Sequence, residues 1–215
     1  MNISIIGIGN IGSALGKLIA NHTQHTLAFG SRETDKADDL NAGLQRKATI
    51  ATPAEAVRAG EIVILATPFP ALSEVAASLD GAEALAGKIL VDVSNPLTAD
   101  MMGLTVSGQD SAGETVARLF PGAHVVKAFN TVFAPVLAGH TPDQKTTSAP
   151  TVFVAGDDAG AKAKIVALAA ELGFDALDAG PLTNSRYLES ALELMIQLAQ
   201  GQGLGTNIRL RVLRG

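Results

Sequence analysis

The 215-residue chain contains no cysteine and no tryptophan, and aromatic residues make up only 4% of it. Without cysteine it has no disulfide framework, no thiolate nucleophile and no thiolate metal site. A formal net charge of −5, with no basic tract, argues against nucleic acid as the main partner. The scarcity of aromatic rings also removes a stacking platform for single-stranded nucleic acid. No apolar run reaches the roughly eighteen residues that a membrane span needs.

The chain opens directly on an apolar run, so we expect no secretory signal and a soluble, cytoplasmic protein. With 47% hydrophobic residues it has enough apolar material for one large domain, or for one domain with a small appendage. The four histidines fit no ligand spacing, so we expect no metal site; they are His22, His25, His124 and His140.

The first 32 residues carry the most informative pattern. An apolar run at residues 3–6 breaks at the glycine turn GIGNIG, continues into a helix-like segment and returns as a second apolar run at residues 26–29. In such a strand–turn–helix unit the first glycine allows the tight turn. The second admits a pyrophosphate close to the backbone, and the third lets the helix pack closely on the sheet. The residues of this predicted dinucleotide site are Gly7, Ile8, Gly9, Asn10, Ile11 and Gly12.

The end of the second strand indicates which dinucleotide is bound. An NAD site usually has a carboxylate there for the ribose 2′-hydroxyl, whereas this chain has Ser31 and Arg32, with Lys36 one helical turn further on. Hydroxyl and cationic donors suit a 2′-phosphate, so the sequence favours NADP(H). The alternative is a solvated helix start, in which the two cations pair loosely with Glu33 and Asp35.

The rest of the chain alternates short apolar runs with amphipathic stretches, which predicts an α/β Rossmann-type, doubly wound, mostly parallel sheet with a small C-terminal α/β extension. We expect further strands at residues 48–51, 61–66, 88–93, 124–129, 151–155 and 174–178. We expect helices at residues 35–43, 54–59, 71–79, 159–172 and 188–200, and one that starts near 111. The loop-like segment TPDQKTTSAP predicts a boundary between an NADP-binding domain, residues 1–145, and a C-terminal domain, residues 146–215.

Several polar residues lie at strand ends, where parallel sheets bind ligands. The turn after the strand at 61–66 contains Thr67 and Pro68 and should face the cofactor, and Asn95 follows the next strand. Asp92, inside an apolar strand, is either a satisfied structural carboxylate or a site residue. Lys127 is most simply a lysine that snorkels or pairs.

The segment DAGPLTNSR at residues 178–186, with the glycine turn, the Gly30-Ser31-Arg32 end and the VKAFNT strand, resembles two related groups of enzymes. One is the small NADP oxidoreductases that reduce the 8-hydroxy-5-deazaflavin coenzyme F420. The other is the oxidoreductase domain of STEAP metalloreductases, in which a flavin takes the hydride.

This resemblance implies hydride transfer between NADPH and F420, or a flavin such as FMN or FAD, without a catalytic acid or base, in a homodimer. It also assigns residues to the cofactor. Ile8, Gly9, Asn10 and Ile11 would lie under the pyrophosphate, with Ser31, Arg32 and Lys36 around the 2′-phosphate. Thr67, Pro68 and Phe69 would line the path to the nicotinamide, with Asn95 and Ala128 near that ring. Two alternatives stay open: a reductase of a small carbonyl or imine metabolite, and a non-catalytic NADP-binding sensor.

Overall fold

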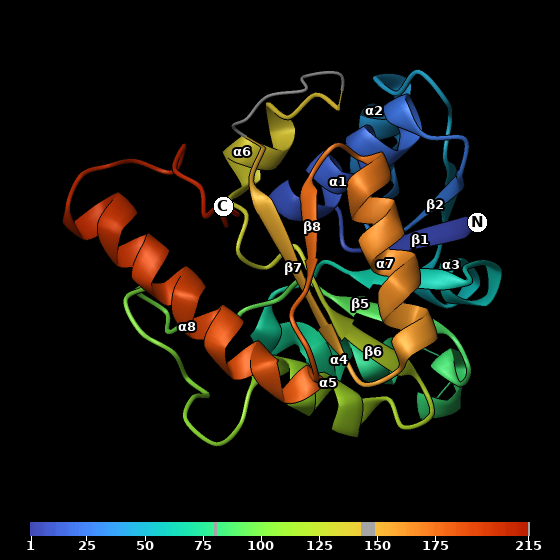
Figure 1. The fold of residues 1–215 in the computed structure, drawn as a ribbon. Coiled ribbons are helices and arrows are strands. Elements are labelled where there is room, and N and C mark those ends of the chain that lie inside the picture. The colour runs from blue at the N-terminus through green and yellow to red at the C-terminus, as the bar shows by residue number, and fades with distance from the viewer. Residues whose placement is uncertain (80, 143–148, 215) are drawn as a thin grey trace.

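The computed structural model describes residues 1–79, 81–142 and 149–214. Eight strands form one sheet in the order β3-β2-β1-β4-β5-β6-β7-β8 (Figure 1). Neighbouring strands are parallel except β6 and β7, which pair antiparallel, so the predicted Rossmann-type fold is confirmed. The strands are β1 (Asn2–Ile6), β2 (Thr26–Gly30), β3 (Thr49–Ala51), β4 (Ile62–Leu65), β5 (Ile89–Asp92), β6 (His124–Lys127), β7 (Thr151–Gly156) and β8 (Asp175–Asp178).

Helices cover both faces of the sheet (Figure 1). One apolar core lies between the sheet and α1, α2, α6 and α7, and a second lies between the opposite face and α3, α4 and α5. The strands β4 and β5 are buried along their whole length, as expected for apolar runs at the centre of a parallel sheet. The helices are α1 (Asn10–His22), α2 (Thr34–Ala42), α3 (Pro53–Ala59), α4 (Leu72–Ser78), α5 (Ala112–Leu119), α6 (Ala134–Ala138), α7 (Ala159–Glu171) and α8 (Ser185–Ile196).

Local sequence signals fix several helix starts. Thr52 and Glu55 form a reciprocal capping box at α3, with Pro53 in its first turn. The Ser111 side chain accepts a hydrogen bond from the backbone N–H of Glu114 and so caps α5. Thr52 and Ser111 are residue types that N-caps favour, so these helix starts follow from local sequence.

Some boundaries differ from the predicted ones. The strand expected at residues 124–129 ends at Lys127, because Phe129 takes a positive φ of 60° that no strand continues through. The helix expected at residues 188–200 begins three residues earlier, at Ser185, and its end is a π-helical turn, Gln197–Gly201. The short helix α6 was not predicted.

The expected domain boundary between residues 145 and 146 lies outside the described residues. On its C-terminal side, β7 and β8 extend the same sheet and α7 packs against both strands. Helix α8 packs against α5 along the outside of the molecule (Figure 1). The division into two domains stays a prediction.

Candidate dinucleotide site

The glycine turn between β1 and α1 is built by three glycines with different surroundings. Gly7 has a φ of +97°, and a Cβ there would lie 2.6 Å from the Ala66 carbonyl oxygen. A Cβ on Gly12 would lie 2.0 Å from the Gly7 carbonyl oxygen, so this position admits only glycine. Around Gly9, by contrast, no atom lies within 4 Å of the place of a Cβ. Open space next to bare backbone is what a pyrophosphate requires.

The N-terminus of α1 adds to this cradle. Gly9 is its N-cap residue and supplies no side-chain hydrogen bond to the first backbone N–H groups. Those groups, and the positive end of the helix dipole, are therefore available to a phosphate. Asn10, Ile11 and Gly12 form this first turn. The residues present thus fit a dinucleotide.

A pocket of about 380 Å³ lies beside the glycine turn, between the carboxyl ends of β1, β2 and β4 and the helix α4. It is bounded by the residues that the sequence assigned to the turn and to the ribose phosphate, together with several that the sequence did not single out. Its lining is Ile6, Gly7, Ile8, Gly9, Gly30, Ser31, Arg32, Glu33, Lys36, Pro53, Ala66, Thr67, Pro68, Ala71, Glu74, Val75 and Ser78.

The charged side chains of this pocket form two ion pairs. Arg32 contacts the carboxylate of Glu74, which lies in the first turn of α4. Lys36 Nζ lies 3.8 Å from Glu33 Oε2. All four side chains are mostly exposed, from 59% for Lys36 to 71% for Glu33. The cations lie where the sequence placed them, but each has a carboxylate beside it.

Ser31 is nearly buried and its hydroxyl is engaged locally. It donates to the Glu33 carbonyl oxygen at 3.1 Å and accepts from the Glu33 backbone N–H at 3.0 Å. The hydroxyl therefore fixes the turn that carries Arg32. Donation of this O–H to a phosphate would require the bond to the carbonyl to break.

The remaining predicted site residues lie at the ends of β4, β5 and β6. Phe69 begins a short 3₁₀ turn, Phe69–Ala71, and packs against the core rather than lining the pocket. Asn95 and Asn130 form a pair: Asn95 Nδ2 donates to the Asn130 carbonyl at 3.1 Å, and Asn130 Nδ2 donates to Asn95 Oδ1 at 2.9 Å. The Ala128 side chain is fully buried in the core, so only its backbone is available to a ligand.

Four of the six buried side-chain polar atoms that have no hydrogen-bond partner among the described residues lie at the same strand ends, and the other two are on α8. The four at the strand ends are the hydroxyls of Thr67, Ser94 and Thr131 and the side-chain oxygen of Asn130. Orphaned atoms of this kind indicate a place for water or a ligand. The carboxyl ends of β4, β5 and β6 thus form a polar edge, of which Thr67 lines the pocket.

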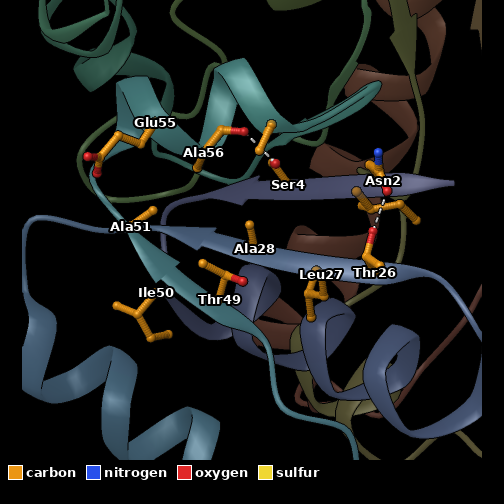
Figure 2. A pocket seen from close by; sticks show the side chains of 12 residues that line it. Asn2, Ser4, Thr26, Leu27, Ala28, Thr49, Ile50, Ala51, Glu55 and Ala56 are labelled. Carbon is orange, nitrogen blue, oxygen red and sulfur yellow. Dashed lines mark hydrogen bonds between the residues drawn. The ribbon is translucent and has the colours of Figure 1, made fainter.

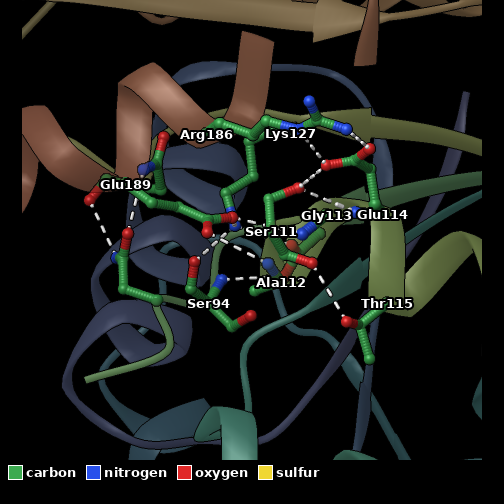
Figure 3. A network of polar contacts seen from close by, with 12 residues as sticks. Ser94, Ser111, Ala112, Gly113, Glu114, Thr115, Lys127, Arg186 and Glu189 are labelled. Carbon is green, nitrogen blue, oxygen red and sulfur yellow. Dashed lines mark hydrogen bonds and ion pairs between the residues drawn. The ribbon is translucent and has the colours of Figure 1, made fainter. Parts of the chain in front are cut away.

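A buried ion network lies beneath this edge (Figure 3). Lys127 Nζ, fully buried at the end of β6, lies 2.7 Å from Asp92 Oδ2, 2.8 Å from Glu189 Oε1 and 2.6 Å from the Ser94 carbonyl oxygen. Asp92 also accepts from the Ser94 backbone N–H at 2.9 Å. Of the alternatives for Asp92, the structure shows the satisfied carboxylate, and Lys127 is the paired lysine that was expected.

Glu189 of α8 completes the network. Its two carboxylate oxygens accept the backbone N–H groups of Ala112 and Gly113 at 3.0 and 3.1 Å, at the N-terminus of α5. Burial raises the pKa of Glu189, and Asp92 adds to the rise, while Lys127 and the Ala112 N–H oppose it. The carboxylate thereby ties α8 to both α5 and the sheet.

A second polar group joins α5 to the start of α8 (Figure 3). Arg186 Nε donates to Glu114 Oε2 at 2.8 Å, and its Nη2 contacts the other carboxylate oxygen. The Arg186 guanidinium lowers the pKa of Glu114. Arg186 belongs to the DAGPLTNSR segment, so in this structure that segment acts as a link between the sheet's last strands and α5.

Sequence reasoning missed Glu74 and Glu189. Glu189 carried a signal, because it falls on the same stripe of α8 as Leu192 and Ile196, where a charge is costly unless paired. Glu74 carried none, since its contact with Arg32 depends on the tertiary placement of α4 beside the pocket.

The hollow in Figure 2 has a volume of about 530 Å³ and lies over β1, β2 and β3 beside α3. Its polar groups bond to one another: Ser4 Oγ donates to the Ala56 carbonyl at 2.6 Å, and Thr26 Oγ1 to Asn2 Oδ1 at 2.5 Å. Glu55 is used in the α3 capping box. These internal contacts leave no charged side chain of the lining free to recognise a ligand.

Within residues 1–79, 81–142 and 149–214 no three His, Cys, Asp or Glu side chains gather as a metal site would require. No helix in the same described part of the chain is long and apolar enough to cross a membrane.

Comparison with known proteins agrees with this geometry. A family profile described as "NADP oxidoreductase coenzyme F420-dependent" matches residues 2–96. The rat metalloreductase STEAP3 is 31% identical over 188 residues, which cover 87% of this chain but only 36% of the rat protein. A crystal structure of a candidate F420-dependent NADP reductase from Arthrobacter sp. FB24 superposes over all of both chains with a TM-score of 0.85 and 32% identity.

The F420-dependent NADP reductase of Methanothermobacter marburgensis is 30% identical over 219 aligned positions, covering 92% of each chain. With a match of that extent, and with the glycine turn and its pocket in place, this chain belongs to the family of coenzyme F420-dependent NADP oxidoreductases and is an NADP-dependent oxidoreductase.

Proposed function

We propose that this chain transfers a hydride between NADPH and the deazaflavin coenzyme F420. The observation that carries the proposal is the pocket in which the open backbone at Gly9 and the cations Arg32 and Lys36 lie within one lining. The similarity of the whole chain to an F420-dependent NADP reductase supports the choice of acceptor.

The first part of the proposal concerns how the residues hold NADPH. The pyrophosphate lies on Ile8, Gly9, Asn10 and Ile11 at the N-terminus of α1, where Gly7 and Gly12 shape the turn. Arg32 and Lys36 bind the 2′-phosphate, with Ser31 holding the turn that carries them. A guanidinium grips a phosphate in bidentate fashion, which makes Arg32 the main contributor.

The second part concerns the rings. Thr67 and Pro68, which line the pocket, border the path from the adenosine to the nicotinamide, with only the backbone of Phe69 beside them. Asn95 and the Ala128 backbone lie near that ring. The bound cofactors supply the chemistry, a hydride passing between them while a proton is exchanged with solvent. The chain holds the two rings face to face and excludes water. The Asn95–Asn130 pair offers donors and acceptors to a carboxamide or ring carbonyl at this edge.

A flavin, FMN or FAD, is the second candidate acceptor. The 31% identity to the rat metalloreductase STEAP3 favours it, although this chain spans 36% of that protein's length. The experiment is NADPH oxidation by the purified protein with F420 and, separately, with FMN, FAD and riboflavin. We expect saturable turnover with F420. Turnover with flavins alone would assign the flavin, and tight NADPH binding without turnover would favour the sensor or a small-metabolite reductase.

Arg32→Gln tests the assignment to NADP. Loss of charge-assisted hydrogen bonds to a phosphate costs about 1.5–3 kcal/mol, so the Kd of NADPH should rise about 10- to 100-fold. The Kd of NADH should change little. The control is Arg214→Gln, which removes a similarly exposed, ion-paired arginine far from the pocket. An equal loss of both cofactors would defeat the assignment.

We also propose a homodimer, as expected from the resemblance. Helix α8 carries exposed Tyr187 and Leu194, 73% and 59% exposed, on the side turned away from the sheet. Large exposed apolar side chains favour an interface with a second copy. Light scattering of the purified protein should give twice the monomer mass, and a monomer mass would reject this. The cytoplasmic location expected from the sequence stays a prediction.

A further inference from the structure

The ion pair between Arg32 and Glu74 joins two segments that are distant in the sequence. Arg32 follows the end of β2, and Glu74 lies in the first turn of α4, 42 positions later. Both line the same pocket. The guanidinium that would grip a 2′-phosphate is therefore in contact with a carboxylate of the protein itself.

This pair is exchangeable. The side chain of Arg32 is 69% exposed and that of Glu74 is 63% exposed, so water screens the attraction between them. Exposed ion pairs of this kind stabilise proteins only weakly. A phosphate dianion carries more negative charge than a carboxylate and forms the same bidentate pair with a guanidinium, so it can displace Glu74 from Arg32.

Displacement leaves a negative charge beside the new anion. Glu74 is anchored in the first turn of α4 and lines the same pocket as Arg32, so its carboxylate remains close to the phosphate that replaces it at Arg32. Like charges at such a separation repel. A ligand with a 2′-hydroxyl does not meet this repulsion, because Arg32 keeps its pairing with Glu74.

We propose that Glu74 is a specificity-determining residue whose carboxylate competes with the 2′-phosphate for Arg32 and so narrows the preference for NADPH over NADH. The inference rests on the proposed binding of NADP at this pocket and adds a residue that opposes it. Glu33 plays a weaker part of the same kind, because its carboxylate lies 3.8 Å from Lys36 Nζ.

The test is Glu74→Gln, which keeps the shape of the side chain and removes its charge. Calorimetric titration with adenosine 2′,5′-bisphosphate, in which the 2′-phosphate is isolated from the rest of NADP, should show a Kd lowered about 3- to 10-fold. The Kd of adenosine 5′-monophosphate should not change. In the variant the Kd of NADPH should likewise fall while the Kd of NADH stays the same. The ratio of the NADH Kd to the NADPH Kd should therefore rise by about the same factor.

Salt dependence gives a second readout. Removing Glu74 leaves one more uncompensated positive charge in the pocket, so binding of the bisphosphate should weaken more steeply with added salt in the variant. The matched control is Glu83→Gln, an exposed glutamate outside the pocket, which should leave both constants unchanged.

Two results would overturn the inference while the proposed function stands. If the wild type prefers the bisphosphate and Glu74→Gln weakens its binding, then Glu74 orients Arg32 for the phosphate instead of competing with it. If the variant leaves that preference unchanged, Glu74 has no part in selection. If neither the wild type nor Glu74→Gln binds the bisphosphate better than the monophosphate, the pocket does not select a 2′-phosphate, and the proposed function is refuted instead.

Discussion

Two ion-pair regions lie at the same edge of the sheet, and they are opposite in environment. At the pocket beside β2, Arg32 and Lys36 pair with carboxylates while all four side chains stay mostly exposed. At the ends of β5 and β6, Lys127 lies between Asp92 and Glu189, and none of these three side chains is more than 1% exposed. The first region can exchange a partner for a ligand, whereas the second cannot without unfolding.

The difference shows how one fold separates binding from rigidity. Exposed ion pairs contribute little to stability, so substitutions at the pocket can change ligand affinity and leave the fold intact. A buried charge that loses its partner is severely destabilising. The buried network also fixes the Ser94 carbonyl and N–H, next to Asn95, so the polar edge proposed for the nicotinamide rests on a rigid base.

The largest expected effect follows from removing Lys127. Lys127→Met keeps the approximate volume but leaves two buried carboxylates without their cation, so the free energy of unfolding should fall by about 3–5 kcal/mol. Urea denaturation followed by circular dichroism measures it.

The comparison for this variant is Lys162→Met. Lys162 is 14% exposed, but its partner Asp178 is 59% exposed and stays in water when the lysine is removed, so the loss should cost about 1 kcal/mol. Equal midpoints for the two variants would show that burial does not distinguish the two classes of ion pair.

Glu189 should produce a smaller, pH-dependent effect. Its pKa in the folded protein is raised above the ordinary value of 4.5, chiefly by burial. The folded state therefore holds the proton more tightly than the unfolded chain does, so protonation stabilises the fold. Stability from this group is greatest below about pH 4.5 and is lost as the pH rises through the folded pKa. Glu189→Gln removes this titration.

The measurement is the difference in unfolding free energy between wild type and Glu189→Gln at pH 5 and at pH 8. As the pH rises, the unfolding free energy of the wild type should fall relative to that of the variant. The fall should be about 1.4 kcal/mol for each unit by which folding raises the pKa of Glu189. Carboxylates with lowered pKa values, such as Glu114, give the opposite slope in both proteins and cancel in the difference. If the unfolding free energy of the wild type relative to the variant stayed constant or rose with pH, the raised pKa of Glu189 would be contradicted.

The fold was predictable because its signals are local. The glycine turn, the apolar runs of β4 and β5 and the caps at Thr52 and Ser111 each depend on a few neighbouring residues. The end of β6 was not predictable from the sequence, because the positive φ of Phe129 depends on how this segment packs in the core. Boundaries that depend on packing lie beyond a reading of local pattern.

The candidate site divides in the same way. The turn and the strand-end cations were legible because their spacing along the chain is the motif itself. The partners of those cations were only partly legible. Glu33 is a sequence neighbour of Lys36. By contrast, Glu74 contacts Arg32 from α4, and Glu189, 62 positions after Lys127, contacts that lysine from α8. Contacts between distant segments require the tertiary structure.

The smallest expected effect on stability belongs to Lys36→Gln. Lys36 is 59% exposed and its amine lies 3.8 Å from Glu33, so the free energy of unfolding should change by less than about 0.5 kcal/mol. The Kd of adenosine 2′,5′-bisphosphate should nevertheless rise about 2- to 5-fold at low salt, since a cation at the pocket is lost, and the rise should shrink as salt is added. The control is Lys17→Gln, which removes the same charge from an exposed lysine of α1 outside the pocket. It should change neither the free energy of unfolding nor the Kd of the bisphosphate. If Lys36→Gln destabilised the fold without weakening the bisphosphate, the exposed pairs would be structural elements, and the separation between the two regions would fail.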